Sequence, residues 1–361
     1  MKRIIYPERD NWQQRHFDIG FDYYNLPSTD GSIYWSEGVS YEFHLKQIEQ
    51  LEDAANELHQ MCLQVADRII QSGDYPDYFQ IPQTAIPSIE HSWKSKAPML
   101  YGRFDFAYDG QNIKMLEYNA DTPTGLLEAS VAQWHWIEEV QNVPHRDQFN
   151  SIHEDLIERW KQLFAPKTLV HFAACQEAGR EDWGNLEYLM DTAFQAGLSV
   201  SELSMENLGW DQTQFVDLND QAINHLFKLY PWEWIWEENF STFIKPDSQW
   251  IEPCWKMLLS NKAILVELWK QFPHHPLLLE SHAFNPNDRF NGKWVRKPIL
   301  AREGANIHII QNNVDCGEAS GSFHFKDYDK YGYIMQKWAP TPLHEGMLPT
   351  LGLWMVGDEC S

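Results

Sequence analysis

Between Ser40 and Gly73 the apolar positions follow a helical period. They recur every three or four residues, which places them on one face of an α-helix. These positions are Phe43, Ile48, Leu51, Ala55, Leu58, Cys62, Val65 and Ile69. Ser40 is a favourable N-cap residue, and Gly73 is a favourable C-cap residue. The pattern predicts one long amphipathic helix, followed by a connector from 80 to 98 that contains three prolines and has no clear period.

The segment from Met99 to Asp121 has the pattern of a β-hairpin. Its two apolar runs are separated by Asp109-Gly110-Gln111-Asn112, a turn-prone tetrapeptide whose glycine accepts positive φ. We therefore expect two short facing strands, Tyr101–Phe106 and Met115–Asn119.

Beyond the hairpin, helix and strand patterns alternate. Helices are predicted over Gly125–Val140 and Phe149–Leu163. Thr168–Ala174 has the composition of a short buried strand, and a polar loop then leads to a helix over Asn185–Ala196. With a further strand opening at Gly197, this order indicates an α/β unit.

The part of the chain from Trp255 onward combines one helix, over Asn261–Gln271, with several strands. The strands are expected around Trp294–Leu300, Tyr331–Trp338 and Leu351–Val356. We therefore predict an α+β (α/β) fold with four regions. Their boundaries are 1–96, which is mainly helical, 97–165, which contains the hairpin and two helices, 166–254, the α/β unit, and 255–361.

Composition narrows the class of partner. The 361 residues carry 52 acidic and 28 basic side chains, a formal charge of −24 that repels a nucleic-acid backbone. Nucleic acid is therefore not expected as a partner. An acidic surface favours a cationic substrate such as a polyamine, although solubility alone accounts for the same charge.

The cysteines and the apolar runs bear on location. None of the five cysteines stands in Cys-x-x-Cys spacing, which argues against a disulfide framework or a structural zinc site. The first residues lack the apolar stretch of a signal peptide. The most apolar later stretch, Met257–Trp269, is interrupted by polar residues and is too short to span a bilayer. We expect a cytoplasmic protein with no membrane partner.

Four polar side chains share one face of the predicted hairpin. Side chains alternate along a strand, so Arg103 and Asp105 lie on one face, as do Glu117 and Asn119. A three-residue loop from Gly110 to Asn112 would place Asp105 opposite Glu117, and Arg103 opposite Asn119. Two carboxylates and an amide oxygen suit Mg²⁺, which would relieve the repulsion between the carboxylates. The alternative is a solvated sheet face with an ion pair between Arg103 and Glu117.

Two lysines and a small polar loop are candidates for binding an anion. Lys262 stands at the start of a predicted helix, and Lys297 interrupts an apolar strand, where a lysine needs an anionic partner such as nucleotide phosphate. The loop Ala301–Asn306 follows, and its backbone N–H groups could close over phosphate. The alternatives are snorkelling or surface lysines and an ordinary hairpin turn.

Together these segments resemble the synthetase domain of glutathionylspermidine synthase, an ATP-grasp ligase. The segments that carry the resemblance, in the same order and at similar separations over nearly the whole chain, are Gly102–Phe106, Glu117–Thr124, Asn261–Leu265, Lys297–Ile299 and Gly304–Ile307. The resemblance implies an ATP-grasp fold in which 97–165 carries the Mg²⁺ and substrate site, 166–254 is inserted and 255–361 binds ATP. It also implies an ATP-dependent carboxylate–amine ligase that forms an acyl phosphate, which the amine then attacks.

The resemblance further implies roles for individual residues. Asp105, Glu117 and Asn119 would hold Mg²⁺, and Arg103 would be catalytic, steadying the transferring phosphoryl group. The ATP contacts would come from Arg103, Phe104, Asp105, Lys262, Lys297, Glu303, Gly304, Met335, Gln336, Lys337 and Trp338, the last four forming the adenine strand. The substrates would be a small-molecule or peptide carboxylic acid, near Thr122 and Thr124, and an amine such as a polyamine, near Glu181 and Asp182.

The chain also departs from the family that it resembles. Thr122 and Thr124 replace serines of the family, so the acid and the amine are unassigned, and an Arg-containing C-terminal segment of the family would lie beyond Ser361. Two other classes of function stay open. These are a metal-dependent hydrolase and a non-catalytic binding protein with an aromatic-rich surface at Trp232–Trp236, although buried core is the favoured interpretation of those aromatics.

Overall fold

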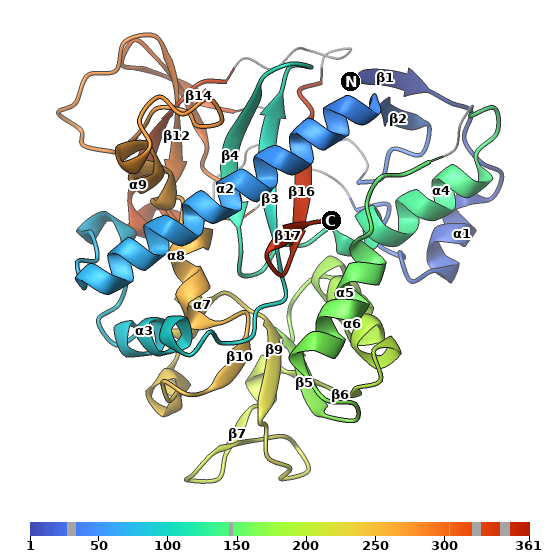
Figure 1. Cartoon of the computed structure of the whole chain (residues 1–361), viewed down its shortest axis with the longest axis vertical. Helices are drawn as coiled ribbons and strands as arrows, with labels where there is room; N and C mark the ends of the chain where they lie inside the picture. The colour runs from blue at the N-terminus through green and yellow to red at the C-terminus, as the bar shows by residue number, and fades with distance from the viewer. Residues whose placement is uncertain (27–33, 144–146, 303, 320–325, 340–346) are drawn as a thin grey trace.

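The computed structural model describes residues 1–26, 34–143, 147–302, 304–319, 326–339 and 347–361, which fold as a mixed α+β structure (Figure 1). Its α-helices are α1 (Trp12–Asp18), α2 (Leu45–Ser72), α3 (Ile86–Lys94), α4 (Gln133–Glu139), α5 (Ile152–Leu163), α6 (Arg180–Gln195), α7 (Trp232–Ile235), α8 (Met257–Ser260) and α9 (Ile264–Gln271). A π-helical turn, η2 (Glu128–Ala132), leads directly into α4.

Three larger sheets carry most of the strands. The first is antiparallel, in the order β17 (Glu359–Cys360), β16 (Thr350–Val356), β3 (Tyr101–Tyr108) and β4 (Ile113–Asn119). The second is parallel, in the order β10 (Gln249–Ile251), β9 (His225–Leu229), β5 (Leu169–Ala174) and β6 (Ser199–Ser204). The third is antiparallel, in the order β11 (Ser281–Ala283), β15 (Tyr333–Lys337), β12 (Lys293–Pro298), β13 (His308–Gln311) and β14 (Val314–Glu318).

Two antiparallel pairs of strands complete the β-structure. They are β1 (Lys2–Ile5) with β2 (Val39–Glu42), and β7 (Gly209–Trp210) with β8 (Phe215–Val216).

The predicted long helix is confirmed as α2, but it begins later than expected. Ser40 lies in β2, which pairs with β1, and the helix starts after His44, whose N–H donates to the Gln47 side chain at 3.1 Å. Gly73 ends the helix in the left-handed conformation with φ 66°, as a C-terminal glycine commonly does. The apolar face of α2 packs across the sheet that contains β3, β4 and β16 (Figure 1).

The expectation of a connector from 80 to 98 is wrong, because this segment contains α3. Its prolines do not prevent a helix, since Pro87 occupies the first turn, where no backbone N–H is required. The predicted hairpin, the strand at Thr168–Ala174 and the last three strands are confirmed as β3, β4, β5, β12, β15 and β16.

The α/β unit is confirmed as the parallel sheet, against which α5 and α6 pack in a second hydrophobic cluster. Helix α6 begins at Arg180, earlier than predicted, so Glu181 and Asp182 lie in its first turn instead of in a loop. The aromatic segment is largely core, as favoured, because Trp232 is only 2% exposed and packs beside Trp236 and Trp250.

Within the residues that the structure describes, no helix combines the length and the apolar character that crossing a membrane requires. The boundaries between the four predicted regions stay a prediction.

Candidate functional site

The hairpin brings the four predicted polar residues together in the expected register. Asp105 pairs with Glu117, and Arg103 with Asn119. The loop itself differs from the prediction, because Tyr108 pairs with Ile113 and four residues, Asp109–Asn112, connect the strands. A β-bulge beyond Asp105 restores the predicted register, since the extra residue, Leu116, shifts the pairing by one position.

Arg103 is held on three sides. Its guanidinium donates to both carboxylate oxygens of Asp105, at 2.7 and 3.0 Å, and to the carbonyl of Thr124 at 2.6 Å. The ring of Trp354 lies 5.7 Å from the guanidinium carbon. Gly352, opposite Asp105 on β16, leaves room for the side chain, because a Cβ there would lie 3.1 Å from Arg103 Cδ. The direct partner of Arg103 is therefore Asp105 and not Glu117.

Glu117 faces lysines from the third sheet and from the segment after α8. Lys262 Nζ lies 3.0 Å from its carboxylate and also donates to the carbonyl of Ala301. Burial raises the pKa of Glu117, but the charges of Lys262 and Lys297 outweigh burial and lower the pKa below its usual value. Arg103 and Lys262 thus neutralise the two carboxylates whose repulsion the sequence predicted.

Lys297 is buried where β4 meets the third sheet. It is 5% exposed, and its ammonium donates to the carbonyl of Leu116 at 3.0 Å and to Gln336 Oε1 at 2.8 Å. Gln336 in turn donates to the carbonyl of Met115 at 3.2 Å. Since β4 is an edge strand, these two side chains satisfy carbonyls that the sheet leaves unpaired. Burial lowers the pKa of Lys297 to about 8, and the charge of Glu117 partly opposes this shift.

A cavity opens at the end of the hairpin. It is lined by Arg103, Glu117, Tyr118, Asn119, Asp121, Thr122, Thr124, Pro231, Glu233, Ser260, Lys262, Leu300, Ala301 and Arg302. One hollow is therefore lined by several residues with predicted roles. They are Glu117 and Asn119, predicted to hold metal, Arg103, predicted to be catalytic, Thr122 and Thr124, predicted to contact substrate, and Lys262, predicted to contact ATP. Asn119 Oδ1 accepts the N–H of Thr122 at 3.2 Å, which shapes the turn that leads out of β4.

The predicted amine residues lie beside this cavity. Asp182 accepts a hydrogen bond from Arg302 at 3.1 Å, and Arg302 lines the cavity. The carbonyl of Glu181, one residue earlier in the first turn of α6, accepts the amide N–H of Asn185 at 2.9 Å. Glu181 and Asp182 therefore stand at the end of α6 nearest the hairpin, although neither lines the cavity directly.

Several predicted ATP contacts are not brought to this group. Phe104 points to the opposite face of β3, where its ring stacks on Tyr118 with centroids 3.8 Å apart and is fully buried. Of the predicted adenine strand, only Gln336 faces Lys297. Met335 packs in a small core cluster and Lys337 lies over Trp294, both on the other face of β15. These side chains alternate with Gln336, so the strand directs them to the face away from Lys297, and their contact with ATP stays a prediction.

The remaining predicted contacts are Trp338, which directly follows β15, and Glu303 and Gly304, which follow β12 in the sequence. The ring of Trp338 is covered by Lys293 Nζ at 3.5 Å. Glu303 lies outside the described residues. Gly304 has φ 70°, a left-handed conformation that favours glycine.

Two features of the site were missed from the sequence. Asp121 is buried and ion-paired with Lys228 of β9 at 2.6 Å, and it also accepts the N–H of Trp232. This contact fixes the end of β4 against the parallel sheet. Glu233, next to Trp232, lines the cavity, and burial raises its pKa to about 7. A lysine inside the apolar run Leu226–Leu229 was the available signal, because a buried lysine requires a partner.

The hairpin offers three oxygen ligands for Mg²⁺ only if the side-chain amide of Asn119 binds together with the carboxylates of Asp105 and Glu117. Among the described residues, no group of three or more His, Cys, Asp or Glu side chains is suited to hold a metal ion. Asp105, Glu117 and Asn119 supply two carboxylates and one amide oxygen, which are ligand types that Mg²⁺ accepts together with water and substrate phosphates.

The chain is similar to known proteins over nearly its whole length. The sequence profile of the glutathionylspermidine synthase preATP-grasp family matches residues 3–361. A Haemophilus influenzae protein named "Putative acid--amine ligase" is 49% identical over 367 residues, covering 99% of this chain and 93% of that protein. The bifunctional glutathionylspermidine synthetase/amidase of Escherichia coli is 27% identical over 304 residues, covering 76% of this chain.

More distant similarities extend the comparison. The trypanothione synthetase of Crithidia fasciculata is 26% identical over 89% of this chain. The chain spans about half the length of the Escherichia coli and Crithidia relatives, 48% and 52% respectively. The structure of a glutathione synthetase-like effector of Globodera pallida aligns with 99% of this chain and 94% of its own length, with a TM-score of 0.55. The sequence identity is 10%, so this similarity concerns the fold alone.

The profile match over nearly the whole chain and a relative at 49% identity decide the classification. The chain belongs to the glutathionylspermidine synthase preATP-grasp family of acid–amine ligases.

Proposed function

We propose that this chain is an ATP-dependent carboxylate–amine ligase of the ATP-grasp type whose site is the hairpin cavity. The observation that carries the proposal is the gathering of Arg103, Lys262 and Lys297 around Asp105 and Glu117. Within this group of five residues, three cations stand against two carboxylates, in a protein whose formal charge is −24, while Asp121 and Glu233 line another part of the cavity. A local positive surplus in an acidic protein favours an anion such as nucleotide phosphate.

The residues present fit Mg-ATP. Asp105, Glu117 and Asn119 are the residues that would hold Mg²⁺. Lys262 and Lys297, whose charges both act on Glu117, would contact phosphate oxygens. When bound, Mg²⁺ spreads and neutralises the charge on the phosphates during transfer. Because Lys297 is buried against two acceptors of the protein, its position is fixed before a ligand arrives, which lowers the entropy cost of binding.

The proposed reaction uses ATP as a substrate. An oxygen of the carboxylic acid attacks the γ-phosphorus, the bond to the β–γ bridging oxygen breaks and ADP leaves. The amine nitrogen then attacks the acyl carbon, inorganic phosphate leaves, and the nitrogen loses a proton to give the amide. Arg103 is the residue proposed to stabilise the transferring phosphoryl group and the oxyanion at the acyl carbon, because Asp105 and Thr124 hold its guanidinium in place.

The acidic side of the cavity is proposed to take the amine. Asp182 pairs with Arg302, the charge of Arg302 also acts on Glu233, and Glu181 precedes Asp182 in the first turn of α6. Such an acidic group favours a cationic amine. Relatives of the chain are named glutathionylspermidine and trypanothione synthetases, so glutathione and polyamines are the first substrates to try.

The proposed function is tested by phosphate release from Mg-ATP against a panel of peptides, amino acids and polyamines. We expect release that requires both an acid and an amine, with one amide product formed per ADP. Release of a product without ATP would instead indicate the hydrolase. If Mg-ATP does not bind, the ligase proposal fails.

Lys297→Met is expected to weaken Mg-ATP binding by roughly two orders of magnitude, because the proposed charge pair between a phosphate of ATP and a buried, fixed ammonium is lost. Isothermal titration calorimetry with Mg-ATP measures the change without requiring the acid or the amine. Lys161→Met, which removes an exposed lysine paired with Glu158 on α5, is the matched control and should bind as the native protein does. Equal affinity of the Lys297 variant and this control would contradict the phosphate role.

We further propose that Glu233 accepts the proton that the amine loses. Burial raises its pKa to about 7, the charge of Asp121 adds to the shift, and Lys228 and Arg302 oppose it. A base with a pKa near the working pH is suited to this step. We expect turnover to rise with pH through about 7, and Glu233→Gln to remove this rise and lower turnover by about 10²-fold.

Stability gives a second readout for Glu233 that requires no substrate. Because its folded-state pKa lies above that of the unfolded chain, stability falls as the pH rises through about 7. Glu233→Gln should therefore raise the thermal unfolding midpoint at about pH 8 and change it little near pH 5. Glu158→Gln, at an exposed position of α5, is the control. A pH-independent difference would show that Glu233 does not titrate in this range.

A further inference from the structure

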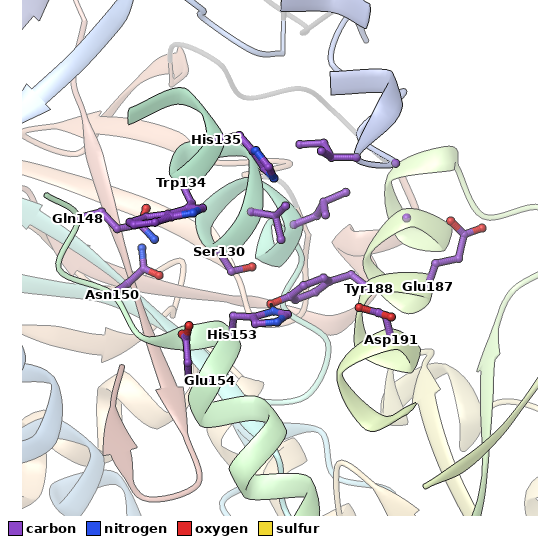
Figure 2. A pocket seen from close by; sticks show the side chains of 15 residues that line it. Ser130, Trp134, His135, Gln148, Asn150, His153, Glu154, Glu187, Tyr188 and Asp191 are labelled. Atoms are coloured by element: carbon purple, nitrogen blue, oxygen red, sulfur yellow. Dashed lines mark hydrogen bonds between the residues drawn. The ribbon is translucent and has the colours of Figure 1, made fainter. Parts of the chain in front are cut away.

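A second cavity lies further along α6, away from the hairpin. It has a volume of about 570 Å³ and is lined by residues from η2, α4, α5, α6 and the loop after α1. Figure 2 shows the labelled side chains of these elements gathered around it. No lining residue is shared with the cavity at the hairpin. Its volume is in the range typical of small-molecule sites.

One wall of this α5–α6 cavity is aromatic and apolar. Trp134 of α4 is 44% exposed, whereas the other tryptophans that the structure describes are less exposed. Tyr188 of α6 stands opposite and shares a hydrogen bond of 3.1 Å with His153 Nδ1, which fixes both rings (Figure 2). Leu127 and Val131 add aliphatic surface to the lining. An exposed indole above apolar side chains is a surface on which a flat ligand can stack.

The charged groups of the cavity are of one sign. Its described lining contains Glu154, Glu187 and Asp191 but no lysine or arginine. Glu187 is neutralised by two hydrogen bonds from Arg180, at 3.0 and 2.7 Å. Asp191 accepts an amide N–H from Gln195, which carries no charge. Glu154 and Asp191 therefore leave a negative potential beside the aromatic wall, and this favours a cation.

The local backbone provides an independent observation. Helix η2 is a π-helical turn, which places Ser130 and Val131 at the cavity surface. π-helical turns are rare, because the α-helix is normally more stable, and those that do occur are often found at functional sites. The same cavity thus combines an uncommon backbone turn, an exposed indole and uncompensated carboxylates.

We propose that the α5–α6 cavity is a binding site for an organic cation with a flat apolar body. The body would stack on Trp134 and Tyr188, and the ammonium group would lie toward Asp191 and Glu154. This site does not depend on the proposed ligase function, because it shares no lining residue with the hairpin cavity. It is adjacent to that function in the fold, since α6 also carries Glu181 and Asp182 in its first turn.

The test uses tryptamine as the probe, with tryptophol, the neutral alcohol that has the same indole body, as the matched ligand. Binding is measured by saturation-transfer NMR and calorimetry on the full chain with saturating Mg-ATP present. We expect tryptamine to bind about tenfold more tightly than tryptophol. Trp134→Ala should weaken tryptamine roughly tenfold by removing the stacking surface. The pair Glu154→Gln with Asp191→Asn should bring tryptamine to the affinity of tryptophol.

Control variants separate this site from the proposed amine site. Asp182→Asn changes an acidic residue of the same helix next to the hairpin cavity and should leave tryptamine binding unchanged. Absence of tryptamine binding, equal binding of tryptophol, or loss of binding in Asp182→Asn but not in Trp134→Ala would each overturn the proposal. Trp134, Glu154 and Asp191 lie at exposed positions and Asp182 is partly exposed, so circular dichroism should show an unchanged fold. An altered fold in Trp134→Ala leaves the two carboxylate variants to decide.

Discussion

Asp105→Asn is expected to lower ATP turnover by about 10²- to 10³-fold while the protein stays folded. Asp105 accepts two hydrogen bonds from Arg103, at 2.7 and 3.0 Å, and is one of the proposed Mg²⁺ residues. An amide of the same shape carries no charge and presents an NH₂ group toward the guanidinium. Arg103 would then keep the Thr124 carbonyl and at most one hydrogen bond to the amide oxygen, so the site would lose a charge and the two-oxygen contact that orients the guanidinium.

The measurement is steady-state ADP formation, with the acid and amine that give the highest rate in the substrate panel. Asp53→Asn, at an exposed position of α2, is the matched control and should keep native turnover. Glu117→Gln should reproduce the loss, because it removes the facing carboxylate and the partner of Lys262. Near-native turnover in Asp105→Asn, with circular dichroism unchanged, would make the metal and phosphoryl assignments wrong.

The sequence predicted the register of this hairpin for a partly mistaken reason. A three-residue loop was assumed, whereas the strands are joined by four residues and the bulge at Leu116 compensates. A bulge has no clear sequence signal, because Leu116 is an ordinary strand residue. It depends on the third sheet, since the Leu116 carbonyl accepts from Lys297, which lies 181 positions further along the chain.

Alternation of side chains along a strand is sufficient to refine the predicted ATP contacts from the sequence. Phe104 lies between Arg103 and Asp105, so a strand must place it on the opposite face. The same rule separates Gln336 from its neighbours Met335 and Lys337 on β15. The resemblance grouped consecutive residues, but side chains act by face, and only Gln336 of these three faces Lys297.

Buried pairs between distant segments were beyond the sequence pattern. Lys297 was singled out because it interrupts an apolar strand, but its protein acceptors could not be named. The same argument would also have singled out Lys228 and Lys256, which the sequence prediction did not name although each stands among apolar residues. The partner of Lys228, Asp121, is identified only when the parallel sheet is docked on the hairpin, whereas the partner of Lys256, Glu252, lies four residues earlier in the chain. A buried charge can be predicted locally, but a partner from a distant segment depends on the tertiary fold.

Lys256→Met is expected to destabilise the protein by about 3–5 kcal/mol, because it leaves a buried carboxylate without its cation. Lys256 and Glu252 are 2% and 0% exposed, and Lys256 also donates to the carbonyl of Tyr101 at 2.6 Å. Glu252 accepts the N–H groups of Leu100 and Tyr101, at 3.1 and 3.0 Å. The pair therefore anchors the first residues of β3, two positions before Arg103, so the same substitution should also reduce turnover.

The urea midpoint of unfolding measures this loss, and Lys94→Met is the matched control. Lys94 pairs with Glu90 at the same spacing of four residues but is 62% exposed, so its loss should cost less than about 1 kcal/mol. Burial raises the pKa of Glu252 and Lys256 opposes the shift, so the variant should raise this pKa further. A raised carboxyl pKa costs stability as the pH increases, hence the deficit of Lys256→Met should shrink in acid.

Adding Glu252→Gln to Lys256→Met should recover part of the lost stability at neutral pH, because the unpaired buried carboxylate is then removed. A deficit no larger than that of Lys94→Met, or one that grows in acid, would contradict a buried ion pair as the anchor of β3.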